Sequence, residues 1–565
     1  MKHLSIAGYI FFSMLTVQII SCNNKKNMPT REAIAALQLK RGDMVFCGPT
    51  EQQLGRVEFK VPGSEKVRKD FNLALSFLHS FEYDEAEKVF AEIIAEDPAC
   101  AMAYWGVAMS NYHALWTPPT EAELEKGSKA IAIAQSLPQK TAKEIAYINA
   151  IAAFYNDYKI TGHRTRAIRF EKAMEQLYNN FSADKEAGIF YALALTASAD
   201  PADQSFSNQK KAGAILNALY PGEPDHPGIV HYIIHTYDYP GLAAMALPAA
   251  RKYASIAPSS AHAQHMPSHI FTRLGLWEEC ITANLAATSS AKCYAEKAQM
   301  KGHWDEELHS MDYLVYAYLQ KADNKLAKAQ WQYLKSIKDV YPQNFKVAYA
   351  FAAIPSRYLL ENKMWNEAAS MEIHPANFPW QKFPWQKSLV HFTRLLGSVH
   401  IGKLADARNE LKNLNTIYDT LVNQKDAYKA TAVQIQIKSA EAWILFKEGN
   451  NTKALQRMFA AAELEDKTEK HPVTPGEVIP AKELLGDMLL AMNKPAAALE
   501  VYKANLKIHP NRFNGIYGAA LASQHAHDMK SAKYFYQQLV NITNTTASNR
   551  QELDAAKLFL KKATF

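Results

Sequence analysis

Several common signatures of catalysis and nucleic-acid binding are missing from this 565-residue chain. It contains no glycine-rich phosphate loop, no HExxH motif and no nucleophile elbow, so the enzyme classes that carry these motifs are not indicated. Its 63 basic and 56 acidic residues form no basic block, which argues against a nucleic-acid partner. Glycine is scarce, at 22 residues, whereas alanine, leucine, lysine and glutamate abound. This composition favours helix over sheet.

Cysteine is also rare, and none of the five cysteines forms a CxxC pair. We expect Cys100 and Cys280 to fill small buried positions in helices, because free cysteine behaves as a small apolar residue. One disulfide is possible among Cys47, Cys100, Cys280 and Cys293, but the sequence does not assign the pair.

The N-terminus is a predicted targeting segment. Lys2 supplies a positive charge before an apolar run over residues 4–20, which is short for a spanning helix and suits a signal sequence. The tetrapeptide Ile19-Ile20-Ser21-Cys22 resembles a bacterial lipobox. We therefore predict a lipoprotein signal peptide over residues 1–21 and acylation of Cys22, for example by palmitate. An uncleaved anchor helix is the alternative.

The chain carries a recurring pattern of small and aromatic residues with the 34-residue period of a tetratricopeptide repeat (TPR). The predicted units begin at Val67, Ala101, Pro227, Ala261, Leu308, Ile479 and Phe513. The predicted fold is all-α: a TPR superhelix, or α-solenoid, of helix-turn-helix units. The expected organisation is a tether and N-terminal segment over 22–66, an N-terminal block with a histidine-lined groove over 67–345, and a C-terminal block over 346–565.

Histidines concentrate between residues 225 and 277, which hold six of the 19 in the chain. His231 and His265 are 34 residues apart, and so are His235 and His269. Equivalent positions of adjacent repeats lie side by side, and residues three or four apart share a helix face. The imidazoles are therefore expected to gather as two neighbouring stripes, and the resemblance to tetratricopeptide repeats implies that both stripes face the concave groove.

Such a gathering is a candidate metal site, because an ion bound about 2.0–2.1 Å from each ring nitrogen bridges neighbouring histidines. The candidate ligands are His226, His231, His235, Asp238, His262, His265 and His269. The predicted groove-lining residues are Trp105, His113, His309, Asp312 and Tyr316. Asp238 or Asp312 is alternatively suited to orient a metal-bound imidazole rather than to bind the ion.

Three interpretations of the histidines stay open at this stage. They form a metal or catalytic site, with a transition metal such as zinc as cofactor; or they line a ligand groove without metal; or they are structural. The first interpretation has a catalytic form, a metal-dependent enzyme such as a hydrolase that uses a metal-activated water.

Segments 103–106, 226–235, 261–271, 312–320, 468–476 and 510–513 resemble a bacterial family of TPR proteins. The resemblance implies the repeat fold and an exported or anchored location, and it implies no activity. From the fold class we predict a protein that binds a peptide or protein segment in its concave groove, and from the lipobox-like tetrapeptide we predict that it is membrane-anchored. It is expected in the bacterial cell envelope, at the outer membrane, facing the periplasm or the exterior.

Overall fold

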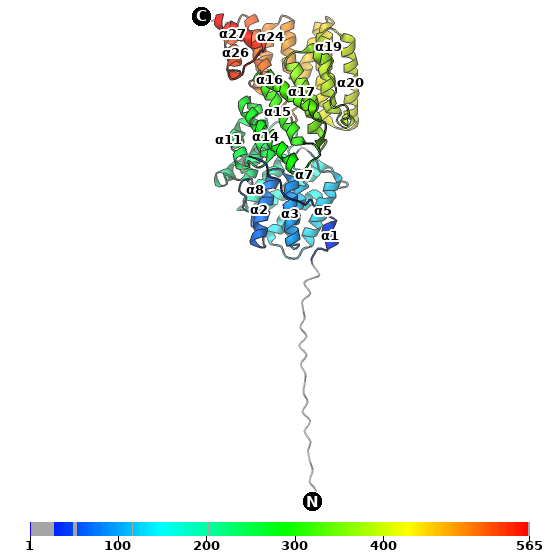
Figure 1. Cartoon of the computed structure of the whole chain (residues 1–565), viewed down its shortest axis with the longest axis vertical. Helices are drawn as coiled ribbons and strands as arrows, with labels where there is room; N and C mark the ends of the chain where they lie inside the picture. Colours follow the sequence, from blue (N-terminus) through cyan, green and yellow to red (C-terminus); the bar gives the residue numbers. More distant parts are fainter. Residues whose placement is uncertain (2–27, 49–52, 116, 202, 563–565) are drawn as a thin grey trace.

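The computed structural model describes residues 1, 28–48, 53–115, 117–201 and 203–562, whose regular structure is almost all helical (Figure 1). The elements up to residue 304 are α1 (Arg31–Ala35), α2 (Glu65–His79), α3 (Tyr83–Glu96), α4 (Ala101–Ser110), α5 (Glu121–Ser136), α6 (Ala142–Tyr155), α7 (His163–Asn180), α8 (Lys185–Ser198), α9 (Ser207–Leu219), η2 (Tyr220–Gly222), α10 (Pro227–Thr236), α11 (Ala243–Ile256), α12 (Ala261–His265), α13 (Pro267–Leu274), α14 (Trp277–Lys297) and β1 (His303–Trp304). The later elements are α15 (Asp305–Gln320), α16 (Asn324–Ser336), β2 (Val340–Tyr341), α17 (Phe345–Glu361), α18 (Trp365–Ala369), η3 (Trp380–Lys382), α19 (Pro384–His400), α20 (Leu404–Asn423), α21 (Ala427–Lys447), α22 (Asn451–Asp466), α23 (Ala481–Ala491), α24 (Pro495–Ile508), α25 (Phe513–His525), α26 (Met529–Ile542) and α27 (Gln551–Lys562). The two strands pair in parallel.

The predicted repeat units coincide with helix pairs. Helices α4, α10, α12 and α25 begin at predicted unit starts, and α2, α15 and α23 begin within three residues of theirs. The small residues of the pattern lie where helices cross closely. A Cβ at Gly106 would come within 2.3 Å of the Phe90 ring, and one at Gly486 within 2.6 Å of the Tyr502 ring. The prediction of an all-α TPR superhelix is confirmed.

The superhelix turns back on itself twice. In the first block, α10 packs against both α8 and α2, so the helix that carries His231 returns to the start of the repeats. Later in the chain, helices α15, α17, α19, α21, α23 and α25 contact one another in sequence, and α25 contacts α15 again. Two hydrophobic cores result, and α15 contributes to both. Figure 1 shows α14 and α15 between the blue-to-cyan helices and the yellow-to-red ones.

Helices α15 to α25 form a closed ring, called the second ring. Its inside is occupied by a segment of the same chain. The segment 467–480 joins α22 to α23 without helix. Arg357 donates to the carbonyl oxygens of Gly476 and Glu477, each at 2.6 Å. The His471 ring lies 5.3 Å from the rings of both Phe345 and Trp385. A partner segment entering this ring would have to displace residues 467–480.

One disulfide ties the N-terminal segment to α14. It joins Cys47 to Cys293, a pairing that the sequence left open. Cys100 and Cys280 are free and buried, as expected for core residues. Cys22 lies outside the described residues. Among the described helices, none is both long and apolar enough to cross a membrane.

Candidate metal centre

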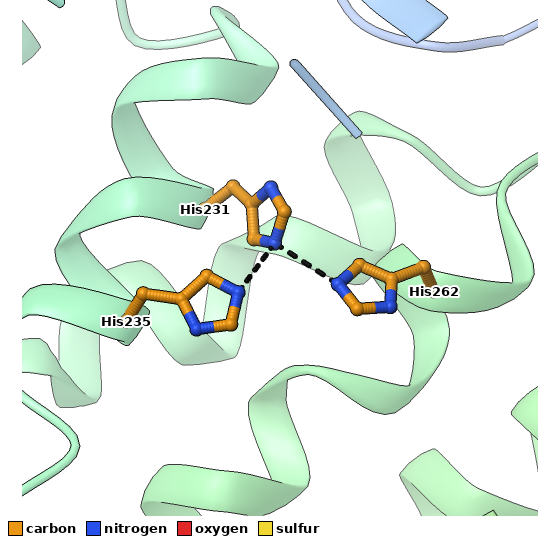
Figure 2. Close-up of side chains that lie close together, drawn as sticks. All are labelled: His231, His235 and His262. Carbon is orange, nitrogen blue, oxygen red and sulfur yellow. Dashed lines mark hydrogen bonds between the residues drawn. The ribbon is translucent and has the colours of Figure 1, made fainter. Parts of the chain in front are cut away.

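The first cluster of histidines, called the first trio, consists of His231, His235 and His262. Helix α10 places His231 and His235 one turn apart on one face, and their Nε2 atoms lie 2.9 Å from each other. The short helix α12 brings Nε2 of His262 to 3.2 Å from Nε2 of His231. Figure 2 shows both other rings turned toward His231. All three side chains are buried.

The second trio, His265, His269 and His309, repeats this arrangement one repeat later. His265 ends α12 and His269 lies in α13, and their Nε2 atoms are 3.1 Å apart. His309, from α15, completes the group, with its ring centroid 4.3 Å from that of His265. Each repeat unit is numbered from its predicted start, such as Pro227, Ala261 or Leu308. In each trio, two histidines then hold positions 5 and 9 of one unit, and the third holds position 2 of the next.

Hydrogen bonds fix the protons of the second trio. Asn284 donates from Nδ2 to the carbonyl oxygen of Cys280 at 2.8 Å, which leaves its amide oxygen facing His265. Nδ1 of His265 donates to that oxygen at 2.7 Å. Nδ1 of His269 donates to the Asp238 carboxylate at 3.1 Å. A neutral imidazole carries only one N–H. The Nε2 atoms of His265 and His269 therefore each carry a lone pair, and these lone pairs face each other.

In the first trio, His231 likewise carries its proton on Nδ1. Nδ1 of His231 lies 2.6 Å from the backbone carbonyl oxygen of His79, which only accepts, so Nδ1 carries the proton. The Nε2 lone pair of His231 then faces Nε2 of both His235 and His262. One lone pair cannot serve two neighbours equally well through hydrogen bonds, whereas a cation among the three nitrogens satisfies all of them.

A proton is a poor candidate for that cation. Burial lowers the pKa of His231, His235, His265 and His309 well below the usual imidazole range. Burial also lowers the pKa of His269, although Asp238 opposes the shift. These five rings are therefore neutral near pH 7. His231, His265 and His269 are held by their neighbours, and their Nε2 lone pairs point toward other rings of their trios. Neutral imidazole nitrogens placed in this way are suited to bind a metal ion.

Asp238 lies behind the second trio and not among its ligand atoms. One carboxylate oxygen accepts from His269 and lies 3.2 Å from Nζ of Lys470, and the other accepts from Nε of Arg273 at 2.9 Å. Burial alone would raise the pKa of Asp238, but Lys470 and Arg273 hold it well below its usual range. Asp238 therefore accepts the Nδ1–H of His269, and its role in orienting a metal-bound imidazole stays a prediction.

His226 belongs to a different cluster, with His79 and Glu186. Its Nε2 donates to one oxygen of Glu186 at 2.8 Å, and Nε2 of His79 donates to the other at 2.9 Å. Burial would raise the pKa of Glu186, yet the two imidazoles hold it far below its usual range. Here each Nε2 carries a proton and already has an acceptor. Nothing in this geometry calls for an ion.

The predicted groove residues are dispersed. Trp105 is buried in the first hydrophobic core, and its ring centroid lies 5.6 Å from those of Tyr147 and Phe190. His113 donates from Nε2 to the Glu123 carboxylate, 3.1 Å away.

The other two members lie on α15. Asp312 accepts from Nε of the buried Arg357 at 3.2 Å. Tyr316 accepts at its hydroxyl from Arg512, 2.8 Å away. Both therefore join the contacts that close the second ring.

Sequence reasoning placed His309 in the groove but not in the ligand set. The signal was present, because His309 and His262 hold the same repeat position. His79, Glu186 and Lys470 carried no such signal. They reach their sites only because distant parts of the chain meet.

The comparisons with known proteins add little. No protein-family description matches the chain, and no curated protein matches it. Similar solved structures include the human IFIT1 dimer with m7Gppp-AAAA, at 12% identity and TM-score 0.34, covering 86% of this chain and 92% of that one. The Cut9–Hcn1 hetero-tetramer of the APC/C matches at 11% identity and TM-score 0.30, covering 88% and 90%. The P58(IPK) TPR domain matches at 16% and 0.20, covering 67% and 99%. With TM-scores this low, these likenesses carry no argument, and the fold assignment rests on the helices themselves.

Proposed function

We propose that this TPR protein binds two transition-metal ions, one in each histidine trio. The proposal rests on His265 and His269, whose Nε2 atoms face each other with their lone pairs at a distance of 3.1 Å. Two nitrogens bound to one ion at tetrahedral angles lie about 3.3 Å apart. The Nε2 separations of 2.9, 3.1 and 3.2 Å in the two trios are close to this spacing. Imidazole suits zinc, copper, iron and nickel.

The test is metal analysis of the full chain, purified in detergent without a histidine tag and loaded with zinc or copper. We expect two equivalents per chain. The His235→Ala and His269→Ala chains should each keep one equivalent, and the double variant should keep none. Two retained equivalents in the double variant, or no binding by the parent chain, would refute the proposal.

A matched control removes two histidines from the surface. His525 and His527 are exposed near the end of α25. A His525→Ala, His527→Asn chain should keep both equivalents, since asparagine tolerates the left-handed backbone at position 527, where φ is 60°. Loss of metal in this control would show that the assay reads general histidine content.

We also propose that Cys22 is acylated and anchors the chain in the bacterial cell envelope, at the outer membrane. The lipobox-like tetrapeptide supports this. Labelled palmitate should enter the parent chain and not a Cys22→Ser chain.

Partner binding in the groove stays a prediction. The fold is of a class that often binds peptides, which is an argument by analogy. In the second ring, the space for such a segment is taken by residues 467–480, so the metal site is the function that the geometry supports best.

A further inference from the structure

A cavity lies between the segment 467–480 and helices α17, α19 and α21. It is separate from the histidine trios, since none of their rings lines it. Its volume is about 70 Å³. Judged by the space that one buried water molecule occupies, roughly five water molecules fit into it. An organic ligand with a similar number of non-hydrogen atoms therefore fits as well.

Aromatic side chains form part of the cavity wall. The rings of Tyr349, from α17, and Trp385, from α19, have centroids 5.3 Å apart. Tyr428, from α21, meets Trp385 at an angle of 83°. The His471 ring lies 5.3 Å from Trp385 and 5.7 Å from Tyr428. Rings set at such angles do not cover one another's faces, and the faces of tryptophan and tyrosine attract organic cations.

The charged part of the lining is acidic. Glu465, Glu469 and Glu477 line the cavity, and no lysine or arginine of the described residues does. Glu469 has a guanidinium nitrogen of Arg273 at 3.7 Å. Glu477 lies 3.9 Å from Nε2 of His509, and burial lowers the pKa of His509 to about 4, so that ring is neutral near pH 7. The cavity is therefore surrounded by more negative than positive groups.

Glu465 has no basic partner among the described residues. One of its oxygens accepts the backbone N–H of Ala481 at 2.8 Å. Lys482, the next residue, pairs with Asp466 instead. Burial and the negative charge of Glu477 raise the pKa of Glu465 well above its usual range. A cation in the cavity supplies the positive charge that this carboxylate lacks.

Two acceptor atoms of the lining also lack a donor. Oε1 of Gln436, a residue only 8% exposed, and Oε2 of Glu477 are buried without a hydrogen-bond partner among the described residues. The hydroxyls of Tyr349 and Tyr428 do not supply one, because each already donates to a backbone carbonyl oxygen. Buried polar groups are normally paired. The missing partner is therefore a donor, as an N–H group of a ligand is.

We propose that this cavity binds a small primary ammonium ion with a short alkyl chain. Glu465 balances its charge, and Oε1 of Gln436 accepts one of its N–H groups. The aromatic rings cover the alkyl chain and the carbon atoms beside the charge. Calcium and magnesium ions suit this lining less, because they require about six or more oxygen ligands. The site is independent of the metal sites proposed above, so either one can fail alone.

The experiment is isothermal titration of the full chain in detergent with three probes of equal size. The probes are n-butylammonium, n-butanol and tetramethylammonium. We expect one equivalent of n-butylammonium to bind. The other two should bind roughly tenfold or more weakly, because n-butanol lacks the charge and tetramethylammonium lacks N–H groups. Equal binding of either probe, or no binding of n-butylammonium at millimolar concentrations, overturns the inference.

Variants of the lining locate the binding. Glu465→Gln keeps the shape of the side chain and its acceptor for Ala481, and should weaken n-butylammonium binding roughly tenfold to a hundredfold. Glu463→Gln is the matched control, since it makes the same change of charge at an exposed position of α22. Gln436→Met removes the unpartnered acceptor and should weaken n-butylammonium but not n-butanol. It also replaces Glu465→Gln if that chain does not fold. Parent-like affinity for n-butylammonium in either cavity variant overturns the inference.

Discussion

The second trio and the His79–Glu186–His226 cluster are both buried, and both are built around two imidazoles whose Nε2 atoms point at one place. They differ in what lies at that place. Between His79 and His226 there is a carboxylate that accepts both N–H groups. The Nε2 atoms of His265 and His269 instead face each other directly, 3.1 Å apart, with no carboxylate of the described residues between them. The same residue type thus forms a structural cluster whose N–H groups are paired in one region, and in the other the site for which we propose a metal ion.

The largest expected effect is on the structural cluster. Glu186→Ala removes the acceptor of two buried N–H groups and should lower the free energy of unfolding by about 3–5 kcal/mol. Chemical denaturation measures this, and metal stoichiometry should not change. The control is Glu175→Ala on α7, whose side chain is 41% exposed. A stability loss as small as that of the control would mean that the cluster does not hold the first block together.

Bound metal should stabilise the region of the two histidine trios. An ion that binds only the folded chain at a hundredfold excess over Kd adds about 2.7 kcal/mol per site. We expect chelator to lower the thermal midpoint of the metal-loaded chain and to leave that of the His235→Ala, His269→Ala chain unchanged. An equal shift in both would place the bound metal outside the trios.

Asp238 sharpens the comparison, because it is a carboxylate that supports a histidine without separating it from its neighbour. Asp238→Asn should weaken metal binding by about 10–100-fold, at one of the two equivalents only. Isothermal titration measures the two affinities. Asp312→Asn is the matched control, since Asp312 is equally buried but pairs with Arg357. Equal weakening in both variants would remove the special role of Asp238.

The smallest expected effect is the pH dependence that Glu186 gives to the stability of the folded chain. Its folded pKa lies far below its usual value, so its contribution to stability is present above the unfolded pKa of about 4.3 and is lost as the pH falls below it. The parent chain should therefore lose more stability between pH 6 and pH 3 than a Glu186→Gln chain (a window of about three units around that pKa). Parallel acid-unfolding curves for the two chains would contradict the assignment.

The two clusters also differ in how far the sequence anticipated them. The pairs His231–His235 and His265–His269 follow from helix geometry, because residues four apart share a face. His226 sits only five residues before His231, yet its ring joins the other cluster. Helix α10 packs against α8 and α2 at that point, which brings Glu186 and His79 to it.

The sequence by itself determined the repeat, the helix starts and the stripe of histidines on each first helix. These depend on local periodicity and on small residues at fixed offsets. The tertiary structure decided which stripes meet. Small rotations between repeats add up until α10 returns to α2 and α25 to α15, and no local pattern encodes that sum. That closure, together with the meeting of α10, α12, α13 and α15, sets the neutral lone pairs of the trios face to face.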